Sequence, residues 1–285
     1  MNEYVATIGM FDGVHRGHQF VLRQVVSTAR ERGMQSMAVT FDRQQSLLMP
    51  LSEKVRRIQA AGITQVEVLP FTDELKQMTA REFMQQVLRD RLNVKVLLTG
   101  YDNRFGHNRE EGYDDYVRYG RELGIEVLRL PAEGTVSSSL IRQQLQEGQV
   151  AEAAVLLGYP YTIDGTVAHG EHVGTTMGFP TANLLPSCQQ QLIPAPGAYA
   201  VTVRVDGDPE VKHAMMNIGR RPTFGDHQMT LEVHVFHFSD DLYGRHLSVS
   251  FIARLRDERR FDDIEALKQQ LHQDMQQAEE ILNSR

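Results

Sequence analysis

The feature that most constrains the fold is the alternation of short apolar runs with helical patterns over the first half of the chain. Amphipathic stretches such as FVLRQVVSTARER and AREFMQQVLRDRL separate these runs. Parallel strands need crossover connections, and right-handed crossovers place helices on both faces of a sheet. Residues 1–157 are therefore predicted to form a doubly wound, Rossmann-like α/β domain, closed by helices over Ser137–Glu147 and Val150–Leu157. The five predicted strands are YVATIG, SMAVTF, QVEVLPF, VKVLLTG and IEVLRL.

The second half of the chain has a different pattern. A length of 285 residues exceeds the roughly 100 to 200 residues of one domain, so a second domain is expected. After Tyr159-Pro160 the runs AYAVTVRVDG, HAMMNIG, MTLEVHVFHF and LSVSFIARL are separated by glycine and proline, which predicts a small closed β-barrel over 158–285. From Asp262 to Leu282 apolar residues recur at helical spacing, so an amphipathic helix should pack on the barrel.

Composition limits the classes of partner. The formal net charge of -7 disfavours binding to a nucleic-acid backbone, because such proteins usually carry a basic face. No apolar run approaches the about 18 residues of a membrane span, and no export signal is visible at the start of the chain. With Cys188 as the single cysteine, no disulfide can form within the chain, and a reducing cytoplasm is expected.

The run GMFDGVHRGH, Gly9 to His18, joins the first predicted strand to the first predicted helix. His15 and His18 then lie at a helix N-terminus, where unpaired amide N–H groups and the helix dipole attract phosphate. Gly13 and Gly17 let the backbone approach that phosphate closely. The histidines would stabilise charge on the α-phosphate of ATP during in-line attack. A helix-capping turn with two surface histidines and a metal site are the alternatives.

Two further segments follow predicted strand ends, where ligands of open α/β sheets bind. In SSSLIR, serine hydroxyls and first-turn amides would hold phosphate while Arg142 adds a bidentate cation, and a simple serine N-cap is the alternative. In YDNRFGHNR the polar side chains would meet a ligand, and a solvated loop is the alternative. These side chains are Asp102, Asn103, Arg104 and Arg109.

The barrel half opens with a glycine-rich passage, GTVAHGEHVGTTMGFPTANLL. Gly170, Gly174 and Gly178 permit tight turns and backbone approach to the phosphates of ATP. In an extended segment Thr181 and Asn183 point to one face, so both side-chain oxygens would reach one Mg²⁺ ion. Taken alone, PTAN also fits an edge strand that begins at a proline.

A carboxylate on a later strand is a candidate general base. In MTLEVHVFHF, alternation puts Leu231, Val233 and Val235 on one face and Glu232, His234 and Phe236 on the other. Glu232 would take the proton from a substrate hydroxyl whose oxygen attacks the γ-phosphorus. A solvent-facing glutamate on a half-buried strand is the alternative.

The N-terminal motifs together resemble the adenylyltransferase half of bacterial bifunctional riboflavin kinase/FAD synthetases. GMFDGVHRGH, GYDNRFGHNR and SSSLIRQQLQEGQVAEAAVLLGYPY carry this resemblance. It implies an HxGH nucleotide-binding motif at His15, Gly17 and His18, and it implies that this half transfers AMP from ATP to FMN. The nucleotide-binding candidates are Gly9, Asp12, Gly17, Ser138, Ser139 and Arg142. The flavin-binding candidates in this half are Asp102, Asn103, Arg104 and Arg109.

The C-terminal motifs resemble the riboflavin kinase module of the same family. GFPTAN, PGAYAV, MNIGRRPTF, LEVHVF, DLYG and LRDERRF carry this resemblance, with Arg256 as a flavin-binding candidate. It implies a six-stranded Greek-key barrel in which Thr181 and Asn183 contact Mg²⁺ and nucleotide and Glu232 is the general base. The implied substrates are riboflavin, FMN and ATP.

The chain departs from the family pattern at four places. Gln44 and Gln45 replace a proline-histidine-proline motif after the second strand, and Asn103 replaces an aromatic residue. Thr175 and His237 replace an arginine and an aspartate of the barrel module. The leading hypothesis is a bifunctional enzyme that makes FMN and then FAD. Alternatives are a riboflavin kinase with a weakened adenylyltransferase domain, a flavin- or nucleotide-sensing regulator without turnover, and an adenylyltransferase for another cofactor.

Overall fold

The computed structural model describes most of the chain and divides into two compact units, Met1–Ser138 and Ser139–Arg285. The described residues are 2–42, 46–101, 103–107, 110–131, 136–168, 179–220, 229–238, 240–259, 261 and 263–284.

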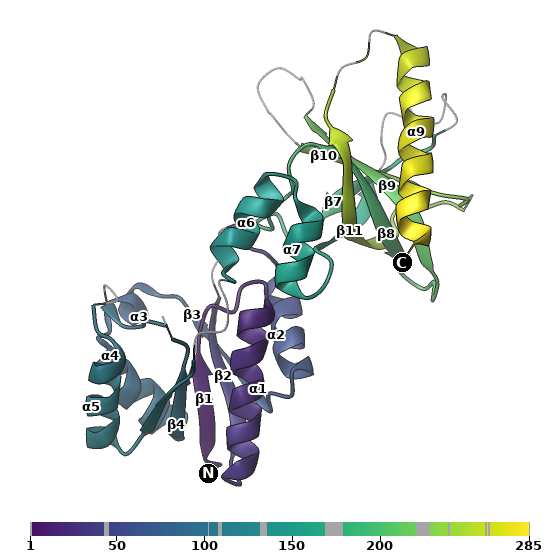
Figure 1. The fold of residues 1–285 in the computed structure, drawn as a ribbon. Coiled ribbons are helices and arrows are strands. Elements are labelled where there is room, and N and C mark those ends of the chain that lie inside the picture. Colours follow the sequence, from purple (N-terminus) through teal and green to yellow (C-terminus); the bar gives the residue numbers. More distant parts are fainter. Residues whose placement is uncertain are drawn as a thin grey trace. The chain divides into compact units, whose positions relative to one another are not determined.

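The first unit is built on a five-stranded parallel sheet (Figure 1). Its strand order is β3-β2-β1-β4-β5, so the chain changes direction across the sheet between β1 and β4. Ligands of such sheets bind beyond the carboxyl ends of the strands at this switch point. The strands are β1 (Tyr4–Ile8), β2 (Gln35–Asp42), β3 (Gln65–Pro70), β4 (Val94–Thr99) and β5 (Glu126–Arg129). All five predicted strands are confirmed.

Helices of this unit cover the sheet and contribute to its core. The predicted helix AREFMQQVLRDRL is present, but it winds as a short α-helix, α4, followed by a π-helix, η1. A capping box between Thr79 and Glu82 begins it. The helices are α1 (Arg16–Glu31), α2 (Leu51–Ala60), α3 (Asp73–Gln77), α4 (Ala80–Glu82), η1 (Phe83–Arg91) and α5 (Tyr113–Leu123).

The second unit is a closed six-stranded barrel with order β10-β7-β6-β11-β8-β9. The predicted barrel is confirmed. Strand β7 pairs with both β6 and β10, so the interpretation of PTAN as an edge strand is wrong: closure of the barrel leaves no edge there. The strands are β6 (Thr162–Ala168), β7 (Ala182–Pro186), β8 (Gly197–Val205), β9 (Val211–Arg220), β10 (Met229–Val235) and β11 (His246–Asp257).

Two helices precede the barrel, α6 (Ser138–Gln146) and α7 (Val150–Leu157), close to their predicted bounds. Apart from Ser138 they belong to the second compact unit, where α7 packs on β11. The amide of Ala195 donates to the carbonyl of Leu145 at 3.0 Å, and the Arg254 guanidinium donates to the Glu147 carbonyl. The division of functions at residues 157 and 158 stays a prediction.

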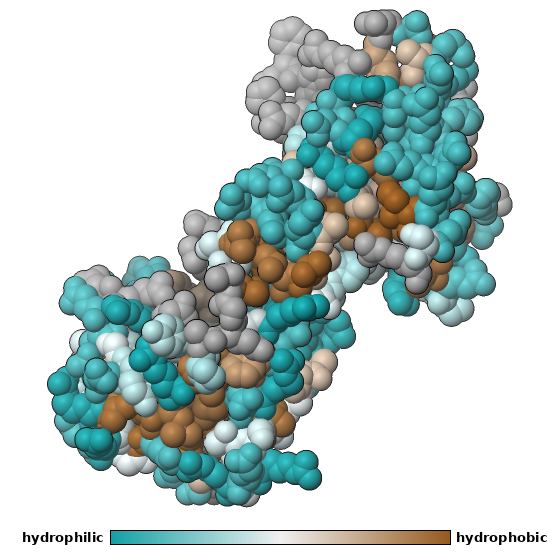
Figure 2. Space-filling view, in the orientation of Figure 1, coloured by the Kyte–Doolittle hydropathy of each residue, from teal (hydrophilic) through white to brown (hydrophobic). Residues whose placement is uncertain are grey.

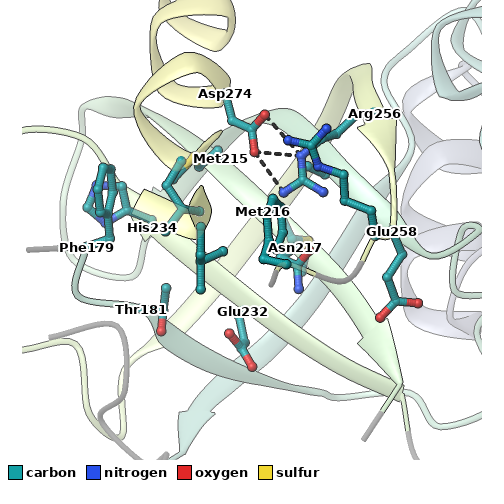
Figure 3. Close-up of a pocket in the computed structure, with 15 residues that line it drawn as sticks. Phe179, Thr181, Met215, Met216, Asn217, Glu232, His234, Arg256, Glu258 and Asp274 are labelled. Carbon is teal, nitrogen blue, oxygen red and sulfur yellow. Dashed lines mark hydrogen bonds and ion pairs between the residues drawn. The ribbon is translucent and has the colours of Figure 1, made fainter. Parts of the chain in front are cut away.

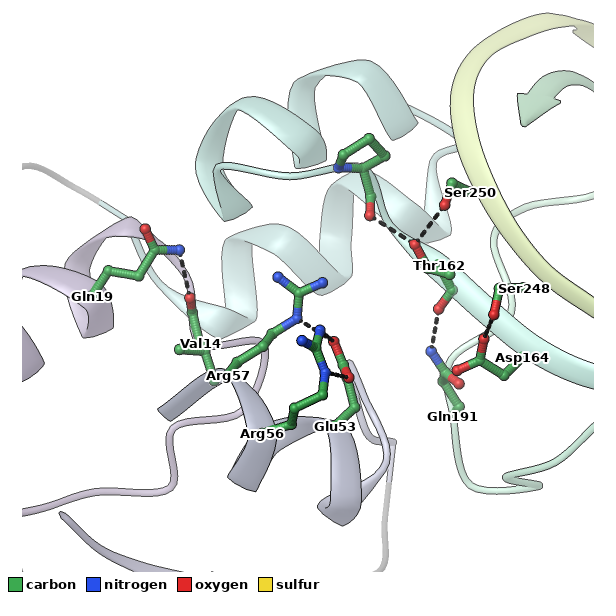
Figure 4. A network of polar contacts seen from close by, with 11 residues as sticks. Val14, Gln19, Glu53, Arg56, Arg57, Thr162, Asp164, Gln191, Ser248 and Ser250 are labelled. Carbon is green, nitrogen blue, oxygen red and sulfur yellow. Dashed lines mark hydrogen bonds and ion pairs between the residues drawn. The ribbon is translucent and has the colours of Figure 1, made fainter. Parts of the chain in front are cut away.

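Polar contacts at the base of the barrel connect its first strand to neighbouring segments (Figure 4). The Thr162 hydroxyl lies 2.9 Å from the Ser250 hydroxyl on β11. Gln191, which is buried, donates to the Thr162 carbonyl at 2.8 Å. These bonds satisfy polar groups that barrel closure removes from water.

The predicted amphipathic tail is helix α9 (Ile264–Asn283), capped by the Asp263 carboxylate. Its inner face buries Ala278 and Leu282 in a cluster with Phe179. Its outer face is hydrophilic (Figure 2). Ile264 was expected on the apolar face, but it is 63% exposed because it lies at the first turn, beyond the apolar cluster.

Gly120 gives a test of how closely α5 packs in the first unit. A Cβ atom at this position would lie 2.3 Å from the Ile125 carbonyl oxygen, which belongs to the backbone and cannot rotate away. Gly120→Ala should therefore lower the free energy of unfolding by about 1–3 kcal/mol, although alanine favours helices. Urea unfolding measures this loss. Arg121→Ala, at an exposed position of the same helix, should change the free energy of unfolding little. Equal stabilities of the two variants would contradict the close packing of Gly120 against Ile125.

Candidate active sites

The turn after β1 has an unusual backbone. Phe11, Gly13 and Val14 have φ angles of 47°, 79° and 33°, in a left-handed region that residues other than glycine rarely adopt. Such strain persists only where surrounding contacts hold it, and it gathers at functional sites. The Gln19 side chain donates to the Val14 carbonyl at 2.8 Å and helps to hold the turn (Figure 4).

His15 caps helix α1. Its Nδ1 accepts a hydrogen bond from the His18 amide at 3.3 Å, and the two imidazole rings stack with centroids 3.6 Å apart. The helix-capping alternative is thus right about the geometry. Its surface histidines are not found, because His15 is 5% exposed and His18 is half-buried. A side chain at Gly17 would press on the His15 ring at 3.3 Å, which explains the glycine.

Burial keeps both rings uncharged near neutral pH. Desolvation lowers the pKa of His15 from 6.5 to about 4. Desolvation also lowers the pKa of His18 well below its ordinary value, and electrostatic interactions with His15 and Lys54 act in the same direction. Because His15 Nδ1 accepts the helix-capping bond, the neutral ring carries its proton on Nε2, which can donate to an anion.

Asp12 ties the turn to two other segments. Its carboxylate accepts the Leu48 amide at 3.0 and 3.2 Å, and its carbonyl accepts the Ser138 hydroxyl at 2.9 Å. The Gly9 amide donates to the Val39 carbonyl on β2 at 3.0 Å. Three predicted nucleotide-site residues of the first unit, Gly9, Asp12 and Ser138, therefore shape the turn itself.

Other predicted residues of this site differ in their placement. The Asn103 side chain donates to the Ile8 carbonyl at 2.6 Å and so joins the ends of β4 and β1. Arg104 is exposed on the same loop. Ser139 and Arg142 lie in α6 of the second compact unit, and their role in nucleotide binding stays a prediction. Asp102 and Arg109 lie outside the described residues, as do Gln44 and Gln45.

The barrel carries a pocket of about 350 Å³ beside α9 (Figure 3). One side of this pocket is apolar and the ends are polar. Its lining residues are Phe179, Thr181, Ala198, Met215, Met216, Asn217, Glu232, His234, Arg256, Glu258, Arg259, Phe261, Leu267, Leu271 and Asp274. The pocket contains three residues that the sequence singled out: Thr181, Glu232 and Arg256.

Thr181 and Glu232 lie toward one end of the pocket (Figure 3). Glu232 is directly opposite Asn183 on β7 and opposite Asn217 on β9. The predicted alternation along β10 is confirmed: Leu231 and Val233 are buried, while Glu232 and His234 line the pocket. Gly170, Gly174, Gly178 and Thr175 fall outside the described residues.

Arg256 lies toward the other end, held by a buried carboxylate (Figure 3). Its guanidinium donates to Asp274 on α9, with Nε and Nη2 both 2.9 Å from Oδ2. Gln270 donates to the same carboxylate at 2.6 Å, and Asp274 is 1% exposed. Sequence reasoning missed Asp274, although an acidic residue within the apolar stripe of an amphipathic helix is a usable signal.

His234 closes the pocket near Phe179. The ring nitrogen Nδ1 lies 2.8 Å from the Pro180 carbonyl, so it carries the proton and donates. Burial lowers the pKa of His234, and the charge of His237 acts in the same direction. The Phe179 ring contacts His234 and His272 edge-on, at centroid distances of 5.3 and 4.8 Å. His237, one of the family departures, pairs with Glu279 at 3.0 Å and is not a lining residue of the pocket.

The donor set at the Glu232 end suits a hard cation that also contacts phosphate. Thr181 and Asn183 offer neutral oxygen atoms, and Mg²⁺ prefers oxygen ligands while keeping several positions for water and phosphate. Among the described residues, no group of three histidine, cysteine or acidic side chains could hold a metal ion. The residues present therefore fit Mg²⁺ bound mainly through a nucleotide.

Comparisons with known proteins agree with both halves. A family model described as FAD synthetase matches residues 1–141, and one described as riboflavin kinase matches residues 157–282. The bifunctional riboflavin kinase/FMN adenylyltransferase of Escherichia coli (strain K12) is 37% identical over 291 residues, covering 97% of this chain and 92% of that protein. The chain belongs to this family. Its relative of the same name from Pseudomonas fluorescens is 38% identical, covering 95% and 90% of the two chains.

A solved structure shares the fold of this family member along nearly the whole chain. It is titled a macrolide-efflux protein from Streptococcus pneumoniae, is 30% identical and superimposes with a TM-score of 0.88. The match covers 96% of this chain and 93% of that one. Across the described residues of this chain, no helix is both long enough and apolar enough to span a bilayer.

The lowered pKa of His15 predicts how stability changes with pH. The unfolded chain binds a proton at about pH 6.5 and the folded chain only at about pH 4, so stability falls as pH is lowered through this window. The loss from His15 is about 3 kcal/mol. His15→Asn keeps a good N-cap acceptor without titrating, so its loss should be smaller.

Urea unfolding at a series of pH values, followed by NMR signals of the first unit, measures this difference. His107→Asn, in a loop of the same unit, is the matched control and should lose stability as the unchanged protein does. Equal pH dependence for His15→Asn and the unchanged protein would show that His15 is not the group that resists protonation.

Proposed function

We propose that this chain is a bifunctional flavin enzyme. Its barrel half, residues 158–285, phosphorylates riboflavin on the ribityl 5′-hydroxyl, and its α/β half, residues 1–157, transfers AMP from ATP to the resulting FMN. The observation that carries this proposal is the barrel pocket, which has Glu232 and Thr181 at one end and Arg256 at the other. Family membership and both matched family models support it. One cysteine, Cys188, suits a cytoplasmic enzyme.

The shape and lining of the pocket suit a flavin. A cavity of about 350 Å³ has the size of a small-molecule site, and its apolar wall of Met215, Met216 and Leu271 would take a flat ring system. Arg256, fixed by Asp274, would donate hydrogen bonds to ring oxygens. The ribityl chain would then extend toward Glu232.

Glu232 acts as the general base in the kinase reaction. Its carboxylate takes the proton of the 5′-hydroxyl while that oxygen forms a bond to the γ-phosphorus of ATP. The bond between the γ-phosphorus and the bridging oxygen breaks, and ADP leaves. Thr181 and Asn183 hold Mg²⁺ together with the nucleotide. When bound, this ion neutralises charge on the phosphates.

The turn from Gly9 to His18, called the histidine turn, serves adenylyl transfer. A phosphate oxygen of FMN attacks the α-phosphorus of ATP, and pyrophosphate leaves with the electron pair of the broken bond. Neutral His15 donates from Nε2 to the phosphate oxygens, and the N-terminus of α1 adds its partial positive charge. Ser138, which donates to the Asp12 carbonyl within the first unit, contributes a further phosphate contact.

A kinase without adenylyl transfer is the second candidate. It is favoured by Gln44 and Gln45, which stand where the family pattern has a histidine between prolines. The strained turn at Phe11 and Val14 favours the bifunctional enzyme, because such strain needs a function to retain it.

Glu232→Gln should separate the two activities. The amide keeps the shape of the side chain but cannot accept the proton, so kcat for FMN formation should fall by about 10²–10⁴-fold. FAD formation from supplied FMN should be unchanged, because that reaction uses the other site. Chromatography of the flavin products measures both rates.

Glu210→Gln, an exposed glutamate between β8 and β9, is the matched control and should leave both rates unchanged. An unaltered rate of FMN formation in Glu232→Gln would overturn the assignment of the base.

A further inference from the structure

A buried lysine on α2 lies beneath the histidine turn. Lys54 is 6% exposed, and its Nζ donates to the Phe41 carbonyl at 2.8 Å and to the Met10 carbonyl at 3.3 Å. Burying an ammonium group is costly unless hydrogen bonds and opposite charges compensate. A lysine at a surface position of this helix would avoid that cost, so its burial calls for a function.

The two carbonyls that Lys54 contacts belong to neighbouring strand ends. Met10 follows β1 and Phe41 lies near the end of β2, and the two strands pair in parallel with Ile8 opposite Val39. The Met10 carbonyl also accepts the Thr40 hydroxyl at 3.1 Å. Lys54 therefore links Met10, near the start of the turn, to Phe41 on the adjacent strand.

Charged and titratable groups surround this ammonium. Desolvation lowers the pKa of Lys54, and the charges of Asp12 and Asp42 act against that effect. On the side of the turn, desolvation is the largest cause of the lowered pKa of His18, and electrostatic interactions with His15 and then Lys54 act in the same direction. His18 Nδ1 is buried and has no hydrogen-bond partner among the described residues, so a charged ring would be poorly solvated there.

We propose that Lys54 is a positioning residue for the histidine turn: its ammonium fixes the Met10 and Phe41 carbonyls and places a positive charge beside the turn. By fixing the turn, Lys54 supports the stacked arrangement of the His15 and His18 rings, and its charge acts in the same direction as burial against protonation of His18. It also adds attraction for the phosphate chain of a nucleotide. This inference rests on the proposed adenylyl transfer, although its structural part concerns the free protein.

The test uses the full chain with Lys54→Met, which keeps the length of the side chain and removes the charge. Lys54→Gln is a second variant, since its amide retains donors for the carbonyls without a positive charge. Arg56→Met removes a positive charge from an exposed position of the same helix and is the matched control. FMN formation from riboflavin, which uses the barrel, should be unchanged in all three.

NMR titration of the imidazole protons is the first readout. The pKa of His18 should rise in Lys54→Gln and Lys54→Met while staying below its ordinary value, because desolvation remains, and it should not move in Arg56→Met. The second readout is FAD formation from supplied FMN and ATP. Its kcat should fall at least about 10-fold in both Lys54 variants, and the acid limb of its pH profile should move to higher pH.

Two results would overturn the proposal: His18 titrates in Lys54→Gln as in the unchanged protein, or FAD formation keeps its rate and pH profile. If Lys54→Met does not fold, Lys54→Gln decides the matter alone. The wild-type protein distinguishes failure of the proposed function from failure of the Lys54 proposal. If the proposed function is wrong, the wild-type protein makes no FAD from supplied FMN and ATP, independently of the pKa of His18.

Discussion

Backbone pairing between neighbouring strands is the constraint on which both sites depend. In the first unit β1 pairs with β2 on one side and β4 on the other, so the ends of these strands meet at one edge of the sheet. In the second unit β10 lies between β7 and β9, which puts Glu232 opposite Asn183 and Asn217. In each case residues far apart in sequence lie next to each other because the hydrogen-bond register between two strands determines which residues are opposite.

Buried charges supply specificity on top of this pairing. Lys54 and Asp274 are buried, and each charge is compensated by at least two hydrogen bonds, with half-buried Arg256 as the partner of Asp274. Removing one partner of such a pair typically costs about 3–5 kcal/mol, because the other charge stays buried. The proposed functions explain why the chain keeps these buried charges. Lys54 orients a phosphate-binding turn, and Asp274 holds the Arg256 guanidinium at the end of a flavin-sized pocket.

Much of the fold and part of each site could be predicted from the sequence. Periodicity alone gave the five parallel strands and the helix on the barrel, and the resemblance gave the number of strands in the barrel. Strand alternation made Thr181 and Glu232 candidates because it fixes the face to which a side chain points, and the resemblance then favoured them over the alternatives. Lys54 and Asp274 were missed, because whether a polar residue on an amphipathic helix is buried depends on distant segments that pack against it. Asn103 bonds to the Ile8 carbonyl 95 residues away, which no local pattern encodes.

Isotope labelling tests the central claim, two phosphate transfers by one chain, most directly. The purified protein is incubated with riboflavin, Mg²⁺ and ATP labelled either at the α- or at the γ-phosphate, and the flavins are separated by chromatography. If one chain carries out both transfers, FMN carries the γ-label and FAD carries both labels, with the α-label entering only at the second step. Label from the γ-position in FMN with no α-label in any flavin would contradict the bifunctional assignment, and no label in FMN would contradict the kinase.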